Sequence, residues 1–502
     1  MDLSQMPTFA LWATSDRDRV AVIGPDGAEI TAGALIDSSH RIARSLQAAG
    51  VGVGDVVAVC LRNGPEVIQV ALATSQIGVY LVPVNRHLAG PEITYILQDS
   101  GAKIVICSPG SLDKCTGTQA VPYVIGGRGA TDFAELDSGS AEPPEHRTAG
   151  ATMTYTSGTT GKPKGVRRPL PSMAPEPIVS AYAAFLLMYG MVPNAGVHLV
   201  VSPMYHTAVM YFATSAVHLG HTVVIMDRWT PEGMLERIAE HRVTNTHMVP
   251  TQLVRLLDVP DRGEYDVSSL QHMIHSAAPC PVHVKRQMLQ WWGPVLYEYY
   301  AASEGGGTMV TPWEWLERPG TVGKAWATAE IAIFDDEGHR LPPGEVGTVY
   351  IKMQQGFAYH GDKAKTDTAW RTDGYFTVGD AGYMDADGYL FLCDRKIDMI
   401  ISGGVNIYPA EIEGALIGHP AVLDVAVFGV PDADWGEQVK AVVELKGEVT
   451  EGLDAEIIAW ARTQLAHYKC PRTIDFAPLP RDPNGKLRKR LLRDPYWPDR
   501  AI

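Results

Sequence analysis

The sequence predicts an α/β fold in a large N-terminal part, followed by a smaller α+β domain. Three observations support this expectation: strand-like and helix-like segments alternate from residue 56 onward, short alternating strands follow residue 335, and the last part of the chain has its own pattern of strands and helices. The 502 residues, 46% hydrophobic and 20% charged, suit a folded chain of several domains and exclude a short disulfide-stapled scaffold.

The first α/β segments lie upstream of residue 110. Apolar, β-rich runs lie at 56–61, 79–85 and 103–108, and helix-like runs lie at 65–78 and 91–101. Alternation at these lengths predicts a largely parallel sheet covered by helices.

The same alternation returns farther along the chain. Residues 198–202 and 221–227 are expected to form strands. Thr230, Pro231 and Glu232 then predict the start of a helix, because they supply an N-cap hydroxyl, a proline at the first helical position and an early acid.

The C-terminal third has a different pattern. Short runs with Gly, Pro and Asp turns at 335–352 and 384–392 predict antiparallel sheet. Beyond about residue 396, a segment of roughly 105 residues predicts strand, helix, strand, strand, helix and strand, which is enough for a separate domain. The basic run 486–493 is expected to form a solvated face of a terminal helix, Lys486 excepted.

Charge and cysteine usage limit the expected partners. With 42 basic and 57 acidic residues the net charge is −15, which disfavours nucleic acid and anionic membranes. The six cysteines form no CxxC pair or zinc-spaced cluster, so reduced thiols are expected. Without a signal-peptide pattern or a run of about 18 apolar residues, we expect a cytoplasmic protein with no membrane span. Whether copies of the chain form a homo-oligomer stays open.

The segment TYTSGTTGKPKGV, residues 154–166, is the sharpest local signal of chemistry. It combines three glycines, four threonines, one serine and two lysines in thirteen positions. Glycines let backbone N–H groups turn inward, hydroxyls add donors and lysine adds positive charge, so the segment predicts a phosphate-binding loop. The spacing does not fit the Walker pattern, because Pro163 and Val166 stand five residues after Gly158 and Gly161, where that pattern requires its second glycine.

Further motifs follow this loop in a fixed order. They are PMYH (203–206), HSAAP (275–279), YYAASE (299–304), YFTVGD (375–380), DRKIDMIISGGVNIYPAEIE (394–413), DWGE (434–437) and RDPNGK (481–486). Together with the loop they resemble the signatures of the AMP-forming adenylate ligases, the superfamily of acyl-CoA synthetases, adenylation domains and firefly-type luciferases. Residues 61–85 are similar to the N-terminal region of that superfamily, so the resemblance covers nearly the whole chain. The chain most resembles a fatty or carboxylic acid–CoA ligase.

The resemblance implies a fold and a reaction. It implies an N-terminal AMP-binding domain, residues 1–394, of layered α/β subdomains with a small β-barrel-like part, and a small mobile α+β domain, residues 395–502. It also implies that ATP and a carboxylic acid, fatty or otherwise hydrophobic, give acyl-AMP, and that coenzyme A then accepts the acyl group. Two alternatives are an adenylating enzyme that loads a carrier-protein thiol or uses the adenylate without CoA, and a nucleotide-binding regulator.

The resemblance also implies which residues hold the nucleotide. Those expected at the β and γ phosphates are Thr156, Ser157, Gly158, Thr159, Thr160, Gly161 and Lys164. Glu304 is the expected Mg²⁺ ligand, since a hard cation prefers carboxylate and phosphate oxygens. Ser276, Ala277, Ala278 and Tyr300 are expected around adenine, with Ser303 at the motif's usual threonine. Asp380 is suited to both ribose hydroxyls because it has two acceptor oxygens, and Arg395 resembles the second ribose or phosphate contact.

The remaining implied residues concern catalysis and the thiol. Lys486 resembles the catalytic lysine of adenylation, which cancels charge between the carboxylate and the α-phosphate. In the family the small domain then rotates about a linker, here 394–398, and the loop Ser402, Gly403 and Gly404 helps to line the path of the thiol. His206 resembles the aromatic gate beside the acyl site, without an acid or base role.

Several positions depart from the family pattern. Ile397 stands where Asp or Lys is usual in the linker, and Val405 stands where Glu is common. Thr207 follows the gate residue, where amino acid activators usually carry Asp, which favours an acid without an amino group. The glycines 305–307 indicate room for a bulky acyl group. Arg167 and Arg168 replace part of a histidine-containing stretch; they are expected to be surface charges, with contact to an anionic substrate or a CoA phosphate as the alternative.

Overall fold

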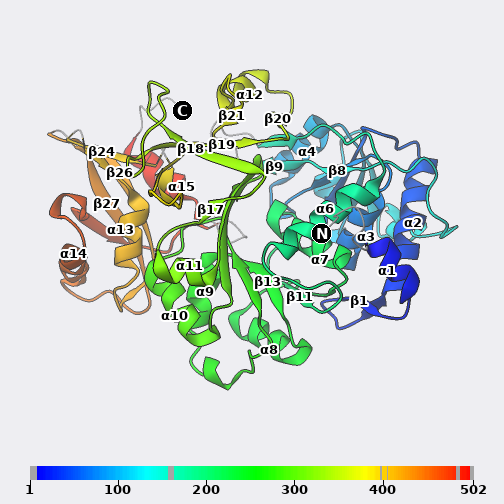
Figure 1. Cartoon of the computed structure of the whole chain (residues 1–502), viewed down its shortest axis with the longest axis horizontal. Coiled ribbons are helices and arrows are strands. Elements are labelled where there is room, and N and C mark those ends of the chain that lie inside the picture. The colour runs from blue at the N-terminus through cyan, green and yellow to red at the C-terminus, as the bar shows by residue number, and fades with distance from the viewer. Residues whose placement is uncertain are drawn as a thin grey trace.

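The computed structural model describes residues 8–156, 163–395, 398–403, 405–432, 434–481 and 487–497, without the side chains of residues 10, 11, 394 and 395. The chain runs from two layered α/β regions through a group of antiparallel strands to a C-terminal domain, coloured orange to red in Figure 1, that lies to one side of the N-terminal part. In these ranges no helix combines the length and apolar character needed to cross a membrane. All six cysteines are free thiols.

A parallel sheet forms the first α/β region. Its strands, in spatial order, are β7 (Thr131–Asp132), β6 (Val121–Val124), β5 (Ala102–Cys107), β3 (Val56–Cys60), β4 (Tyr80–Pro83) and β8 (Ala151–Thr152). The helices α3 (Pro65–Thr74) and α4 (Gly90–Ser100) connect β3, β4 and β5, and α5 (Leu112–Cys115) follows β5. The alternation predicted over residues 56–108 is therefore confirmed, with parallel pairing throughout.

A larger sheet forms the second region. Its order is β17 (Lys324–Ala325), β16 (Gly305–Val310), β15 (Leu296–Ala302), β14 (His272–His275), β13 (Asn245–Met248), β11 (Val197–Val200), β12 (Thr222–Ile225), β1 (Val20–Ile23) and β2 (Glu29–Thr31). Its outer face is covered by α8 (Pro231–His241), α9 (Pro250–Leu257), α10 (Val282–Trp292) and α11 (Pro312–Glu317). The predicted helix start is confirmed, because the Thr230 hydroxyl accepts a hydrogen bond from the Gly233 backbone N–H.

One apolar core joins these two sheets. The helices α1 (Phe9–Ser15), α2 (Ala32–Ala48), α6 (Pro175–Leu187) and α7 (Thr207–His218) contribute to it. It contains Leu35, Ile68, Leu81, Val200 and Phe212, all buried. The loops after β11 and β14 leave the carboxyl ends of parallel strands, which is where open α/β sheets bind their ligands.

Antiparallel strands form the predicted barrel-like part. One sheet contains β18 (Ala329–Phe334), β19 (Gly347–Met353), β21 (Tyr375–Phe376), β22 (Asp380–Met384) and β23 (Leu390–Arg395). A smaller sheet contains β9 (Thr154–Thr156), β10 (Lys164–Arg167) and β20 (Ala358–Tyr359), and α12 (Lys363–Ala369) follows β20. Val166, Tyr300 and Phe376 lie in a shared core, which fixes the hairpin of β9 and β10 beside the end of β15.

The C-terminal domain packs helices α13, α14 and α15 on one mixed sheet. Its elements are β24 (Ile400–Ser402), β25 (Val405–Ile407), α13 (Pro409–Leu416), β26 (Val422–Asp432), β27 (Gly436–Leu445), α14 (Leu453–Gln464), β28 (Thr473–Phe476) and α15 (Lys489–Arg493). In the basic run, Arg490 is half exposed, but Lys489 pairs with Glu413 at 2.8 Å and Arg493 with Asp398 at 3.4 Å. The expectation of a solvated face is therefore wrong for Lys489 and Arg493.

Buried neutral histidines predict acid sensitivity of the fold. Burial lowers the pKa of His198, His218 and His221 to about 4 and that of His247 to about 3. Because unfolding restores a pKa near 6.5, the unfolded chain binds about three more protons than the folded chain between pH 5 and 6. The free energy of unfolding is therefore not reduced by these histidines above pH 6.5, where both states leave them neutral, and it falls as the pH drops toward 4. Urea unfolding at pH 7, 6 and 5 should show a steep fall in the free energy of unfolding, and a flat profile would contradict these pKa values.

Candidate active site

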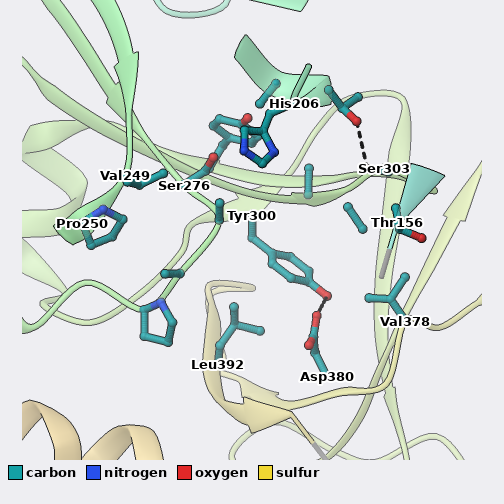
Figure 2. A pocket seen from close by; sticks show the side chains of 18 of the residues that line it. Thr156, His206, Val249, Pro250, Ser276, Tyr300, Ser303, Val378, Asp380 and Leu392 are labelled. Carbon is teal, nitrogen blue, oxygen red and sulfur yellow. Dashed lines mark hydrogen bonds between the residues drawn. The ribbon is translucent and has the colours of Figure 1, made fainter. Parts of the chain in front are cut away.

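One continuous cleft of about 3200 Å³ extends between the N-terminal sheets and the C-terminal domain. Nine of the predicted site residues line it: Thr156, His206, Ser276, Ala277, Ala278, Tyr300, Ser303, Glu304 and Asp380. They come from the ends of β9, β14, β15 and β22 and from the start of α7. Figure 2 shows Tyr300 in the middle of this group, with Ser276 and His206 on one side and Asp380 on the other.

The two strands that flank the predicted phosphate loop, β9 and β10, form a hairpin. Thr156 at the end of β9 pairs with Lys164 at the start of β10, so the loop leaves and re-enters the sheet at adjacent positions. Ser157, Gly158, Thr159, Thr160 and Gly161 lie outside the described residues. The Lys164 ammonium contacts the Asp362 carboxylate at 3.2 Å, and this contact raises the pKa of Lys164, which stays charged at neutral pH.

The loop after β14 has the small side chains expected around a base. The Ser276 hydroxyl lies 2.9 Å from Nε2 of the buried His247. Ala277 has a φ of 73°, in the left-handed region that side chains other than glycine rarely adopt. Such strained backbone persists where the neighbouring structure fixes it, often at ligand sites. Here the strained residue lies in a loop that lines the cleft.

Tyr300 and Asp380 are joined directly. The Tyr300 hydroxyl donates a hydrogen bond of 2.6 Å to Oδ2 of Asp380, as Figure 2 shows. Asp380 follows Gly379, whose φ of 87° makes the turn into β22. In the ladder, Asp380 pairs with the backbone of Arg395 at the end of β23, so the two predicted ribose contacts are cross-strand neighbours.

Replacing Tyr300 with phenylalanine should weaken nucleotide binding. The change removes one hydrogen bond to a carboxylate, and such bonds contribute about 1.5–3 kcal/mol, so the KM for ATP should rise about 10-fold or more with little change in kcat. Steady-state kinetics with varied ATP measure this. Tyr299→Phe is the matched control, because the Tyr299 hydroxyl lies 3.2 Å from His247 instead. An unchanged KM for ATP in Tyr300→Phe would contradict the role of the pair.

Glu304 lies in the turn between β15 and β16 and is 9% exposed. Its Oε1 accepts a 2.9 Å hydrogen bond from the Tyr359 hydroxyl, and burial raises the pKa of Tyr359, so this phenol stays a donor. In the described ranges no cluster of three or more His, Cys, Asp or Glu could hold a metal by itself. The donor set therefore fits a hard cation that takes one carboxylate oxygen and completes its shell with phosphates and water, as Mg²⁺ does.

The start of α7 contacts the Glu304 turn. His206 is the N-cap residue of α7, and its ring centroid lies 4.8 Å from that of Tyr205. Thr207 follows, and its hydroxyl lies 3.0 Å from the Ser303 hydroxyl. Because Thr207 follows His206 and Ser303 precedes Glu304, this contact keeps the predicted gate residue close to the predicted metal ligand.

The geometry can be compared with known proteins. Residues 9–358 match the model of the AMP-binding enzyme family. The chain belongs to the AMP-binding enzyme family. Residues 411–486 match the C-terminal domain of AMP-binding enzymes, and the chain is an acid–thiol ligase of the AMP-forming acyl-CoA synthetase group.

Three relatives illustrate the similarity of this AMP-binding enzyme. The long-chain-fatty-acid–CoA ligase FadD13 of Mycobacterium tuberculosis is 34% identical over 473 residues, 91% of each chain. The fatty acid–[acyl-carrier-protein] ligase ScoC of Streptomyces coeruleorubidus is 31% identical over 501 residues, 95% of this chain and 93% of ScoC. The structure of the o-succinylbenzoate CoA synthetase MenE of Bacillus subtilis with the acyl-adenylate OSB-AMP has a TM-score of 0.81 at 28% identity and covers 97% of this chain and 98% of MenE.

Other predicted residues of this AMP-binding enzyme lie away from the group or outside the described residues. Lys486, Gly404 and the side chain of Arg395 are not described. Ser402 and Gly403 lie at the end of β24, where the Gly403 backbone N–H donates to the Trp435 carbonyl at 2.8 Å. A Cβ at Gly403 would collide with the Trp435 ring, so this turn requires glycine.

Two residues of the cleft were not predicted from the sequence. Tyr359 reaches Glu304 because β20 pairs with β10, across almost 200 residues of chain, and no local motif signals that contact. Arg168, expected at the surface, instead lines the cleft and donates from Nη2 to the Ser303 carbonyl at 2.7 Å. The surface expectation for Arg168 is therefore wrong, because the end of β10 turns this side chain inward.

Proposed function

We propose that this AMP-binding enzyme activates a fatty or otherwise hydrophobic carboxylic acid with ATP and passes the acyl group to coenzyme A. In the first half-reaction a carboxylate oxygen attacks the α-phosphorus of ATP and pyrophosphate leaves. In the second, the thiol attacks the acyl carbonyl, AMP leaves and the thiol proton is released. The observation that carries the proposal is that Glu304, the Tyr300–Asp380 pair and the Ser276 loop meet in one cleft.

Three parts of the cleft hold the nucleotide in this proposal. The loop from Ser276 to Ala278 and the Tyr300 ring take the adenine, since small residues allow close approach and an aromatic face stacks a base. Asp380 accepts hydrogen bonds from the ribose, with Arg395 beside it in the ladder. The hairpin with Thr156, Lys164 and the hydroxyl- and glycine-rich residues 157–161 takes the β and γ phosphates.

Glu304 is the residue that would hold Mg²⁺. When bound there with the nucleotide, the ion would neutralise charge on the phosphate oxygens. The protein's own contribution is the nearly buried carboxylate and the Tyr359 hydroxyl that fixes its orientation.

The C-terminal domain brings one group to the site in the first half-reaction and another in the second. Lys486 bridges the carboxylate and the α-phosphate during adenylation, and the loop Ser402, Gly403 and Gly404 lines the path of the thiol afterwards. We propose that the chain turns within the linker 394–398, so that these groups alternate at one site. His206 forms the gate between the acyl site and the nucleotide.

The walls of the acyl side support a hydrophobic acid. Phe185 contacts Tyr211 at 5.2 Å and Trp326 at 5.4 Å between ring centroids, and all three line the cleft. Thr207 offers no carboxylate for an α-ammonium group. The identity to ScoC, which acts on an acyl-carrier-protein, keeps a carrier-protein thiol as the second candidate for the acceptor.

Two assays on the purified full chain test this proposal. Incubation with ATP, Mg²⁺ and a panel of fatty, aromatic and alicyclic acids should give pyrophosphate exchange, and adding CoA should give a CoA thioester and AMP. Exchange with a thioester only on a carrier protein would support the second candidate. Absence of exchange with every acid would contradict adenylation itself.

A further inference from the structure

Two adjacent arginines at the end of β10 have opposite environments. Arg167 stacks over the Tyr80 ring, with its guanidinium carbon 4.3 Å from the ring centroid, and its Nη1 lies 3.4 Å from the His360 ring. Arg168 lines the cleft, and its Nη2 donates to the Ser303 carbonyl at 2.7 Å, next to Glu304. Of these two arginines, Arg168 is the one that brings a positive charge to the cleft.

The Arg168 guanidinium has no carboxylate at ion-pair distance in the described part of the chain. Its one hydrogen-bond acceptor there is the neutral Ser303 carbonyl. Burial lowers the pKa of Arg168, and the nearby Glu304 carboxylate opposes that shift only in part. Arginine nevertheless stays protonated, so a cation lies in a desolvated wall without a direct counter-ion.

Glu304 is not a suitable partner for this cation. One of its oxygens already accepts the Tyr359 hydroxyl. In the proposed function its charge also serves the Mg²⁺ that ATP brings. The positive charge of Arg168 therefore has to be balanced by something else in the cleft, because an unpaired charge in such surroundings is costly.

Two phenols border the same part of the cleft. Tyr182 on α6 and Tyr211 on α7 contact each other edge to face at 5.1 Å between ring centroids. Burial raises the pKa of both, so each hydroxyl remains a donor. Among the described residues neither hydroxyl makes a hydrogen bond, and both tyrosines line the cleft near Arg168. Apart from the one bond to the Ser303 carbonyl, the Arg168 guanidinium and the two phenol hydroxyls thus offer donors that have no acceptor among the described residues.

We propose that Arg168, Tyr182 and Tyr211 form a subsite for a second carboxylate, so that the preferred substrate is a hydrophobic dicarboxylic acid. A carboxylate has two oxygens that accept up to four hydrogen bonds and matches the fork of a guanidinium. Tyr211 lies one helical turn, about 6 Å, beyond Thr207, which contacts Ser303 beside the reacting end. The spacer between the two carboxylates is therefore apolar and at least about one helical turn long. This inference rests on the proposed function.

Matched pairs of acids test the subsite. 3-Phenylpropanoic acid is compared with its ring-carboxylated derivatives, and alkanoic acids of six to ten carbons with the α,ω-diacids of the same length, by ATP–pyrophosphate exchange. For at least one pair the wild type should use the diacid about 10- to 100-fold better in kcat/KM, the size expected for a charge-assisted bidentate contact. Arg168→Leu should remove that preference through the KM of the diacid, with the monoacid little changed, and Arg168→Lys should keep part of it.

Controls separate this subsite from a structural role and from the proposed function. Arg167→Leu, the adjacent arginine outside the subsite, should leave the preference unchanged. Preference of the wild type for the monoacid in every pair would overturn the proposal, and so would an equal loss for both members of a pair in Arg168→Leu, which would indicate that Arg168 only holds the Ser303 carbonyl. No exchange with any acid would overturn the proposed function instead.

Discussion

Replacing Lys486 with alanine is expected to lower acyl-adenylate formation about 100- to 1000-fold while thioester formation from supplied acyl-AMP stays near the wild-type rate. The lysine is proposed to cancel charge that builds between the attacking carboxylate and the α-phosphate, and removal of one such aligned donor costs about 10²–10³ in rate. The second half-reaction builds no such charge. Rapid-quench measurement of acyl-AMP, and of thioester from synthetic acyl-AMP and CoA, gives the two rates separately.

Arg490→Ala is the matched control for this experiment. It removes a basic side chain from the same C-terminal run, but Arg490 is half exposed, and its ion-pair partner among the described residues is the nearby Asp494 at 3.0 Å. Both half-reactions should proceed normally in Arg490→Ala. If Lys486→Ala lost both half-reactions equally, the alternation of groups at one site would be refuted.

Replacing Glu304 with glutamine is expected to lower kcat/KM for ATP about 100-fold and to raise the Mg²⁺ concentration needed for half-maximal rate. The substitution keeps the shape of the side chain and an oxygen that can accept the Tyr359 hydroxyl, but it removes the negative charge that a hard cation prefers. Exchange assays over a Mg²⁺ titration at saturating acid measure both effects.

Tyr359→Phe distinguishes the charge of Glu304 from its orientation. This variant keeps the carboxylate and loses one hydrogen bond, so the loss should stay near 10-fold, with a small shift in the Mg²⁺ requirement. An unchanged Mg²⁺ requirement in Glu304→Gln would exclude Glu304 as the metal ligand.

Local patterns in the sequence were enough to predict much of the fold. The alternation at residues 56–108 predicts buried parallel strands and covering helices, because the pattern of apolar residues in each element lies within a short stretch of chain. The hydroxyl of Thr230 caps its helix for reasons contained in four consecutive residues. The motif residues were predicted to share one site because the ordered motifs resemble those of a known family, and the structure brings nine of them to one cleft.

Long-range packing explains what could not be predicted. Arg168 was expected in solvent because a charged residue is usually exposed, but at the end of β10 its side chain turns inward and donates to the Ser303 carbonyl, far away in sequence. The contact of Tyr359 with Glu304 depends on β20 pairing with β10. Lys489 and Arg493 are ion-paired because α13 and residue 398 lie against them. None of these partners is near in sequence.

The central claim is that this cleft holds ATP so that an organic acid can capture its adenylyl group. A crystal structure of the full chain with ATP, Mg²⁺ and a non-reactive acid analogue tests it most directly. We predict the triphosphate at the hairpin between Thr156 and Lys164, Mg²⁺ on Glu304 and the ribose at Asp380. A nucleotide bound elsewhere, or with its phosphates far from Glu304, would contradict the claim.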